Sequence, residues 1–202
     1  ALLLCELDGS EDQVSEDLIK VLEVLSEATS VRVSKNEDER LLFWKGRKSA
    51  FPAVGRLSPD YYCMDGTIPK RYLAEVLEKI SNLSKKYDLR VANVFHAGDG
   101  NLHPLILYDA GKPGELVKAE DFGNDILKIC VDMGGSITGE HGVGIEKLDA
   151  MCHQYNTAEL DVFHQIKAAF DPFSLLNPGK AVPTLHRCAE LGNMHVHHGN
   201  LP

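Results

Sequence analysis

The sequence predicts an α+β fold, in which helices pack on one face of a mostly antiparallel sheet. Three observations support this fold class. Short apolar runs typical of strands alternate along the chain with segments whose apolar residues recur at helical spacing. Two of the runs, residues 90–95 and 102–108, flank a short glycine-containing loop and therefore form an antiparallel hairpin. The length of 202 residues suits one domain, or one domain with an appendage.

The expected strands are short runs that end at turn-forming residues. The first, residues 2–7, ends at Asp8-Gly9, and the third, residues 61–64, ends at Asp65-Gly66. Between them, residues 30–34 alternate polar and apolar side chains, as a half-buried strand does. With the hairpin and the intervening helices, the predicted order is β-α-β-α-β-α-β-β-α.

Four helices are expected between these strands, over residues 11–28, 36–51, 69–87 and 115–133. Ser10 and Asn36 are suitable N-caps for the first two helices, and Pro69 suits the start of the third. Gly134 and Gly135 end the fourth. After them come a glycine-rich connector (residues 136–144), a helical stretch (146–170) and an irregular tail (171–202). We therefore expect an α+β domain over residues 1–135 and a C-terminal segment over residues 136–202.

Composition and charge exclude several classes of protein. A formal net charge of -9 disfavours binding to nucleic acid or to an anionic membrane, because both require a basic face. No apolar run approaches the roughly 18 residues of a membrane span. Five cysteines at long spacings, without a CxxC pair, indicate reduced intracellular thiols. The chain begins at Ala1 within a strand-like run, which we interpret as a piece of a longer protein.

The hairpin carries the main candidate site. His96 and His103 flank its Gly-Asp-Gly-Asn loop at nearly symmetric positions, so cross-strand pairing places their Cβ atoms within about 5.5 Å. The pair alone favours an ordinary turn. Glu140, in the Gly-Glu-His-Gly segment, would complete a two-histidine, one-carboxylate ligand set with an open position, as in catalytic metal sites. If that segment is extended, His141 faces a different space. The alternative is a solvated glycine loop.

Other candidates are weaker when taken alone. Arg47 has the planar fork that binds a substrate carboxylate, although, taken alone, a solvated surface arginine is the favoured interpretation. Asn177-Pro-Gly-Lys180 reads as an ordinary turn. A second metal site in the tail is the less favoured interpretation of its histidines and cysteine, since a solvated tail accounts for them; these residues are His186, Cys188, His195, His197 and His198.

Several motifs in a fixed order resemble one family. They are WKGRKSAF, PDYYCMDGTIP, NVFHAGDGNLHPLI, GGSITGEHGVG, AAFDPFSLLNPGK and PTLHRCAELGNMHVHHGNLP. Over essentially the whole chain, the sequence is similar to the C-terminal part of bacterial FAD-linked 2-hydroxyacid oxidoreductases, the glycolate oxidase and D-lactate dehydrogenase family of vanillyl-alcohol oxidase-type flavoproteins. The resemblance implies a ferredoxin-like cap, or substrate, domain whose N-terminal FAD-binding domain is absent from this chain.

The resemblance also implies roles for individual residues. His96, His103 and Glu140 would bind a divalent metal (zinc, manganese or iron), and His141 would be the general base. Arg47 would hold the substrate carboxylate, while Asn177 and Lys180 would lie near the flavin. Relatives that oxidise D-2-hydroxyglutarate carry Lys and Asn at two positions that here hold Cys63 and Leu105. The expected substrate is therefore a small monocarboxylate, glycolate or D-lactate, which is oxidised to the 2-oxo acid.

The expected partners follow from the same resemblance: the chain's own FAD-binding domain and, as in relatives of glycolate oxidase, iron-sulfur and flavin partner subunits. The expected location is the cytoplasm, peripheral to the membrane through those subunits. Two alternatives remain open. A metal-dependent hydrolase would use the same three ligands to activate water. In the other, the chain on its own is an inactive module with only an interface role, since half of the active site is missing.

Overall fold

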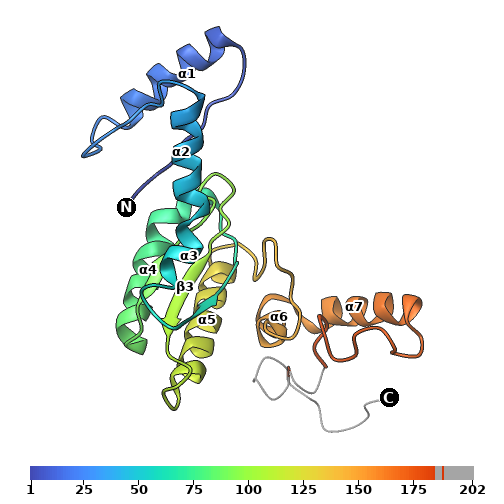
Figure 1. Cartoon of the computed structure of the whole chain (residues 1–202). Coiled ribbons are helices and arrows are strands. Elements are labelled where there is room, and N and C mark those ends of the chain that lie inside the picture. Colours follow the sequence, from blue (N-terminus) through green and yellow to red (C-terminus); the bar gives the residue numbers. More distant parts are fainter. Residues whose placement is uncertain (185–187, 189–202) are drawn as a thin grey trace. The chain divides into compact units, whose positions relative to one another are not determined.

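The computed structural model describes residues 1–184 and residue 188. By their internal contacts the residues divide into two units, Ala1–Ala53 and Val54–Pro202, and each is described by itself. Figure 1 shows the helices and strands of both. Every predicted metal ligand lies in the second unit, whereas Arg47 lies in the first.

The first unit contains helices α1 (Glu11–Val24) and α2 (Glu37–Lys48), and α3 (Ala50–Val54) crosses the boundary between the units. Ser10 and Asn36 cap α1 and α2 as predicted, because their side chains accept hydrogen bonds from the N–H groups of Gln13 and Glu39. The single helix predicted over residues 36–51 is wrong, since it is interrupted at Ser49. Pro52 explains the break, because it has no N–H to donate to the carbonyl of Lys48.

Two predicted strands are not formed. Residues 2–7 and 30–34 have no strand conformation, and the described residues of the first unit contain no strand at all. Their apolar side chains are largely exposed, with 97% of Leu2 and 47% of Val33 accessible. A strand needs the backbone of a neighbouring strand to satisfy its N–H and C=O groups. The apolar pattern was present here, but the partner was not.

The second unit is built on a three-stranded antiparallel sheet. Its strands are β1 (Asp60–Cys63), β2 (Val91–Asn93) and β3 (Pro104–Tyr108), in the order β1-β3-β2. The register places Cys63 of β1 and Ala92 of β2 on either side of Leu105. β2 and β3 form the predicted hairpin, and the antiparallel α+β class is therefore confirmed.

Helices α4 (Leu73–Tyr87) and α5 (Glu115–Asp132) pack against this sheet, and a short 3-10 helix, η1 (Lys70–Tyr72), precedes α4. Val76 and Ile80 of α4 and Phe122 and Ile126 of α5 are completely buried with Ile106 of β3. Both helices follow the predicted apolar spacing, and α5 ends at Gly134, whose φ of 81° suits glycine. The sheet and helix faces together exclude water from one core.

A second cluster of buried residues joins α5 to helices α6 (Leu148–Gln154) and α7 (Thr157–Phe170). It includes Met64, Leu127, Met151 and Leu160. The helical stretch predicted over residues 146–170 forms two helices, α6 and α7, because the chain turns at Asn156. That residue begins α7 with a capping box, exchanging hydrogen bonds with Glu159.

The prediction that all cysteines are reduced thiols is wrong, because the structure contains a disulfide. Cys152 of α6 and Cys188 form a disulfide, while Cys5, Cys63 and Cys130 are free thiols. Widely spaced cysteines gave no sign that two of them meet in space. Residues 171–184 are irregular, as predicted. Of the second metal site considered in the tail, Cys188 is bonded to Cys152, and the other members, His186, His195, His197 and His198, lie outside the described residues.

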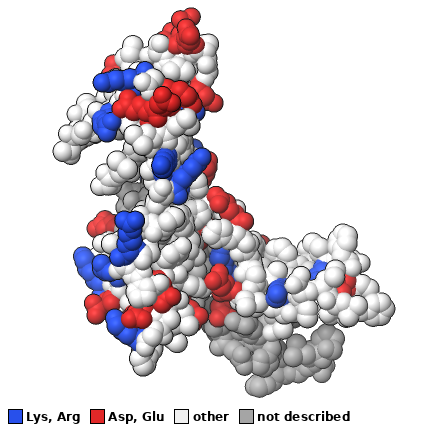
Figure 2. Space-filling model, in the orientation of Figure 1, with Lys and Arg blue, Asp and Glu red and all other residues white. Residues whose placement is uncertain are grey.

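The surface carries charges of both signs. On the face drawn in Figure 2, Lys and Arg side chains are interspersed with Asp and Glu side chains, and the described residues form no continuous basic face there. This distribution agrees with the formal net charge of -9. No helix within the described part of the chain is both long and apolar enough to cross a membrane.

Candidate metal centre

The hairpin places His96 and His103 near one another, but with an offset. The His96 N–H donates to the carbonyl of Asn101 at 3.0 Å, and the Val94 N–H donates to that of His103 at 3.2 Å. His96 therefore faces Asn101 across the hairpin, not His103 as its symmetric position suggested. The two imidazole rings still lie with centroids 5.5 Å apart, in an edge-to-face arrangement.

The structure brings Glu140 to both histidines. Its Oε1 lies 3.7 Å from His96 Nε2, and its Oε2 lies 3.8 Å from His103 Nε2. One ligand atom from each of the three residues lies within 4.8 Å of the others. Ligands about 2.1 Å from a tetrahedral divalent ion are about 3.4 Å apart, so small side-chain adjustments would accommodate an ion. Two imidazoles and one carboxylate are donors that suit zinc, manganese or iron.

The surroundings of His103 favour its neutral imidazole, which is the form that binds a metal. Its side chain is buried, and burial lowers the pKa of this imidazole although the charge of Glu140 opposes the effect. A neutral imidazole offers the lone pair that a metal requires. Asn101, also buried, donates from Nδ2 to Glu140 Oε1 at 2.9 Å. The carboxylate is thus held in place by a residue of the same hairpin.

Sequence reasoning missed Asp65, which organises the Glu140 segment from inside the protein. This fully buried carboxylate accepts hydrogen bonds at its Oδ2 from the N–H groups of Glu140 at 2.8 Å and His141 at 2.6 Å. The hydroxyl of Thr138 also donates to it, and the buried ammonium group of Lys147 pairs with its Oδ1. Asp65 followed a predicted strand and read as a turn residue. Only its burial reveals this function.

The segment around Glu140 is consequently bent, and not extended as considered from the sequence. The bend places Glu140 and His141 beside the same histidine. The His141 ring stacks on the His103 ring, with centroids 5.3 Å apart and planes inclined by 23°. Its Nδ1 lies 4.0 Å from Asp65 Oδ2, and about half of its side chain is exposed. His141 therefore borders the three-residue site without belonging to it.

The remaining candidates belong to other segments of the chain. Arg47 is in α2 of the first unit. Asn177 and Lys180 are exposed and belong to a turn in which Lys180 Nζ contacts Asn177 Oδ1 at 3.4 Å. Their expected roles, carboxylate binding for Arg47 and flavin contact for the other two, stay predictions.

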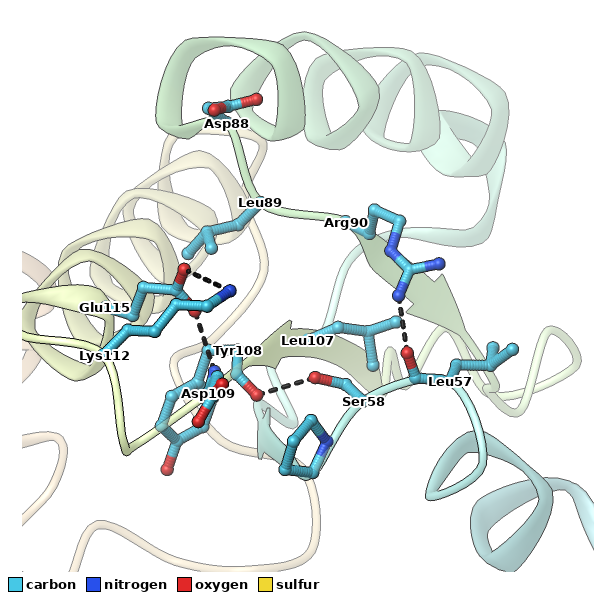
Figure 3. A pocket seen from close by; sticks show the side chains of 11 residues that line it. Leu57, Ser58, Asp88, Leu89, Arg90, Leu107, Tyr108, Asp109, Lys112 and Glu115 are labelled. Carbon is cyan, nitrogen blue, oxygen red and sulfur yellow. Dashed lines mark hydrogen bonds and ion pairs between the residues drawn. The ribbon is translucent and has the colours of Figure 1, made fainter.

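A separate hollow of about 280 Å³ lies at the opposite end of β3 (Figure 3). Several of the polar groups that line it interact with one another. Ser58 Oγ donates to the Tyr108 carbonyl at 2.6 Å, Arg90 donates to the Leu57 carbonyl at 2.5 Å, and Lys112 pairs with Glu115. These interactions give the hollow no evident ligand chemistry, so we assign it no function.

Comparison with known proteins identifies the family of this chain. The family model described as FAD linked oxidases, C-terminal domain, matches residues 1–181. The chain belongs to this family. The resemblance that the sequence motifs suggested is therefore confirmed.

Curated relatives support the same assignment. The chain is 65% identical to the glycolate oxidase subunit GlcD of Escherichia coli K12, an alignment that covers all of this chain and 41% of that protein. It is 36% identical to the Bacillus subtilis protein of the same name over 89% of this chain and 39% of that protein. The mitochondrial D-lactate dehydrogenase [cytochrome] of Arabidopsis thaliana is 28% identical over 92% of this chain and 33% of that protein. The chain spans about two fifths of the GlcD proteins.

A solved structure shares the fold. The 4-ethylphenol oxidase of Gulosibacter chungangensis, solved as an isoeugenol complex, superposes with a TM-score of 0.60 at 17% identity, covering 88% of this chain and 38% of that one. At this identity the match supports the fold alone. Two hypotheses were open for the site formed by His96, His103 and Glu140. Family membership favours the FAD-linked oxidoreductase over the metal-dependent hydrolase.

Proposed function

We propose that this chain is the cap, or substrate, domain of a flavin-dependent oxidoreductase that oxidises a small D-2-hydroxy acid, glycolate or D-lactate, to the 2-oxo acid. The observation that carries the proposal is the convergence of His96, His103 and Glu140, with ligand atoms within 4.8 Å of one another, in a chain of the FAD-linked oxidase family. The relatives named for glycolate and D-lactate support the substrate class.

The three converging side chains would hold a divalent cation. When bound, the cation supplies Lewis-acid polarisation that makes the 2-hydroxyl group of a substrate more acidic. The chain contributes the geometry. The hairpin fixes both histidines, and Asn101 restrains the carboxylate of Glu140 by a hydrogen bond of 2.9 Å. Three protein ligands leave further coordination positions for the substrate.

His141 is suited to accept the hydroxyl proton. Its ring lies next to the His103 ring, its side chain is half exposed, and its Nδ1 faces Asp65 at 4.0 Å. Nε2 is then the nitrogen available to a substrate. An unprotonated imidazole nitrogen can accept a proton, which suits a general base. When bound, FAD would supply a hydride acceptor, and a 2-hydroxy acid that loses its hydroxyl proton and its Cα hydride becomes the 2-oxo acid.

Two paired residues of β1 and β3 bear on the size of the substrate. Cys63 and Leu105 are direct partners in the register of these strands, so they share one face of the sheet, and His103 immediately precedes β3. Leu105 is completely buried, and burial raises the pKa of the Cys63 thiol to about 11, which keeps it neutral. Neither side chain would pair with a second carboxylate, so a monocarboxylate fits better than a dicarboxylate.

The remaining roles complete the proposal. Arg47 would bind the substrate carboxylate through its guanidinium group, and Asn177 and Lys180 would lie near the flavin. The FAD itself would be held mainly by a flavin-binding part outside these 202 residues, so the 202 residues by themselves would be inactive. Further partners would be iron-sulfur and flavin subunits, through which the enzyme would sit in the cytoplasm at the membrane periphery.

The test uses the complete flavoprotein, with this chain joined to its flavin-binding part. Glycolate or D-lactate should reduce the flavin, and D-2-hydroxyglutarate should do so poorly. His141→Ala should lower kcat by at least about 100-fold while metal content is unchanged. His153→Ala, on α6, is the matched control and should retain turnover. The proposal fails if no 2-hydroxy acid reduces the flavin, and the base assignment fails if His141→Ala turns over normally.

A further inference from the structure

Asp65 follows β1 by two residues, and its carboxylate contacts the backbone of the segment that carries the candidate metal ligand Glu140. The Asp65 side chain is completely inaccessible to solvent. A buried carboxylate is stable only when charge and hydrogen bonds compensate its lost hydration. The partners of Asp65 therefore show what its charge is used for.

Backbone groups of one short segment provide most of these partners. The N–H groups of Gly139, Glu140 and His141 lie 3.2, 2.8 and 2.6 Å from Asp65 Oδ2. Three successive N–H groups that converge on one anion form a concave nest, here filled by a side chain of the same protein. A segment wrapped around a fixed anion has its φ and ψ angles restricted at the residues that carry the site's chemistry.

Two further residues complete the arrangement. The Thr138 hydroxyl donates to Asp65 Oδ2 at 3.1 Å and accepts from the Gly142 N–H at 2.9 Å, so it fastens both ends of the wrapped segment. Lys147, of which 1% of the side chain is exposed, forms an ion pair with Asp65 Oδ1. The ammonium group compensates the buried charge at the carboxylate oxygen that the three N–H groups do not contact.

We propose that Asp65 is the positioning residue of this site: it holds the Glu140–His141 backbone so that one side chain reaches the histidine pair and the next stacks on His103. That this positioning serves catalysis rests on the proposed function. That the buried carboxylate holds the backbone segment can be tested independently of the proposed function.

Two variants test the inference in the 202-residue chain. Asp65→Asn replaces an acceptor by an amide and leaves Lys147 without its counter-charge. It should weaken zinc or manganese binding about 10- to 100-fold, as loss of a supporting partner does. Thr138→Val keeps the shape and both buried charges and removes only the hydroxyl. It should fold, lose the hydrogen bonds to Asp65 and from Gly142, and weaken metal binding by at least about 2- to 10-fold, the net effect of a single hydrogen bond.

Matched controls separate positioning from general destabilisation. Asp121→Asn, on the exposed surface of α5, and Thr157→Val, at the exposed start of α7, should leave metal affinity unchanged. A purely structural role for Asp65 would lower the melting temperature of Thr138→Val without changing its metal Kd. That result would overturn the inference.

A readout without metal distinguishes this inference from the proposed function. Hydrogen exchange of the Glu140 and His141 amides should be slow in the wild type and markedly faster in Thr138→Val and in any folded Asp65→Asn. If the wild type binds no metal but the amides behave in this way, the proposed function fails and the positioning stands. If the amides exchange equally fast in wild type and Thr138→Val, Asp65 does not position the segment.

Discussion

The amide Nδ2 of Asn101 donates a hydrogen bond of 2.9 Å to Oε1 of Glu140, linking the hairpin to a segment 39 residues further along the chain. Asn101 also faces His96 across the hairpin, through the backbone hydrogen bond between them. One buried residue thus connects two of the three candidate metal ligands. Its place explains how a loop and a distant glycine-flanked segment hold a common geometry.

Asn101→Ala should weaken metal binding about 10- to 100-fold, because Glu140 loses the partner that orients its carboxylate. Calorimetric titration of zinc or manganese measures the change. Asn82→Ala on the exposed surface of α4 is the control, and its affinity should equal that of the wild type. Equal affinity of the Asn101 variant would show that the hydrogen bond does not orient the ligand.

Gly139→Ala should destabilise the second unit, because an added Cβ would lie 2.5 Å from Asn101 Oδ1 and 2.9 Å from Thr67 Cγ2. Overpacking of this kind costs about 1–3 kcal/mol, and each kcal/mol lowers Tm by about 2–4 °C in a chain of this size. Thermal unfolding followed by circular dichroism measures it. Gly98→Ala, where a Cβ meets open space, should change little. A Tm of Gly139→Ala equal to that of the Gly98 control would contradict the packing found here.

The hydrogen bonds and ion pair of Asp171 should make the stability of the folded chain fall at low pH. Its carboxylate accepts hydrogen bonds from Lys167 Nζ and from the N–H groups of Leu175 and Leu176. The Lys167 ammonium and these N–H groups hold the pKa of Asp171 below its ordinary value of 3.8. Since the folded pKa is the lower one, the stabilisation is complete above the unfolded value and is lost as pH falls through the folded value.

The measurement compares urea unfolding of wild type and Asp171→Asn between pH 6 and pH 2. The wild type should be more stable at pH 6, and the difference should shrink steadily below pH 3.8. A difference that stays constant over this range would mean that the charge of Asp171 does not stabilise the turn.

The disulfide between Cys152 and Cys188 should stabilise the oxidised chain. It closes a sequence separation of 36 residues, for which the chain-entropy treatment gives about 3–4 kcal/mol. Dithiothreitol should lower the urea midpoint of the wild type and of Cys5→Ser, and leave Cys152→Ser unaffected. Titration of the denatured, unreduced protein should find the thiols of Cys5, Cys63 and Cys130 alone. Reaction of all cysteines under those conditions would exclude the bond.

Much of the fold of the second unit could be predicted, because local signals and tertiary packing agree there. Helix α5 has its predicted bounds to within one residue, since apolar spacing, burial of Phe122 and the final Gly134 act together. The strands expected over residues 2–7 and 30–34 failed for the opposite reason. Apolar alternation describes a strand's preference, whereas the partner backbone that realises it is a tertiary property.

Some residues of the candidate site could be predicted from the sequence, and others could not. His96, His103 and Glu140 could be singled out because their side-chain chemistry suits a metal wherever the chain places them. Asp65 and Lys147 could not, because a strand-ending aspartate and a helix-proximal lysine are ordinary on a surface. What distinguishes them is complete burial and mutual pairing, which only the folded structure reveals.

The most direct test of the central claim is a calorimetric titration of zinc or manganese into the wild type, His103→Ala, Glu140→Gln and the exposed α4 control Glu78→Gln. The wild type and Glu78→Gln should bind a single ion with the same Kd. His103→Ala and Glu140→Gln should lose more affinity than the roughly 10- to 100-fold expected from removing a supporting partner. Wild-type protein that binds no ion, or ligand variants that bind it with the wild-type Kd, would contradict the account.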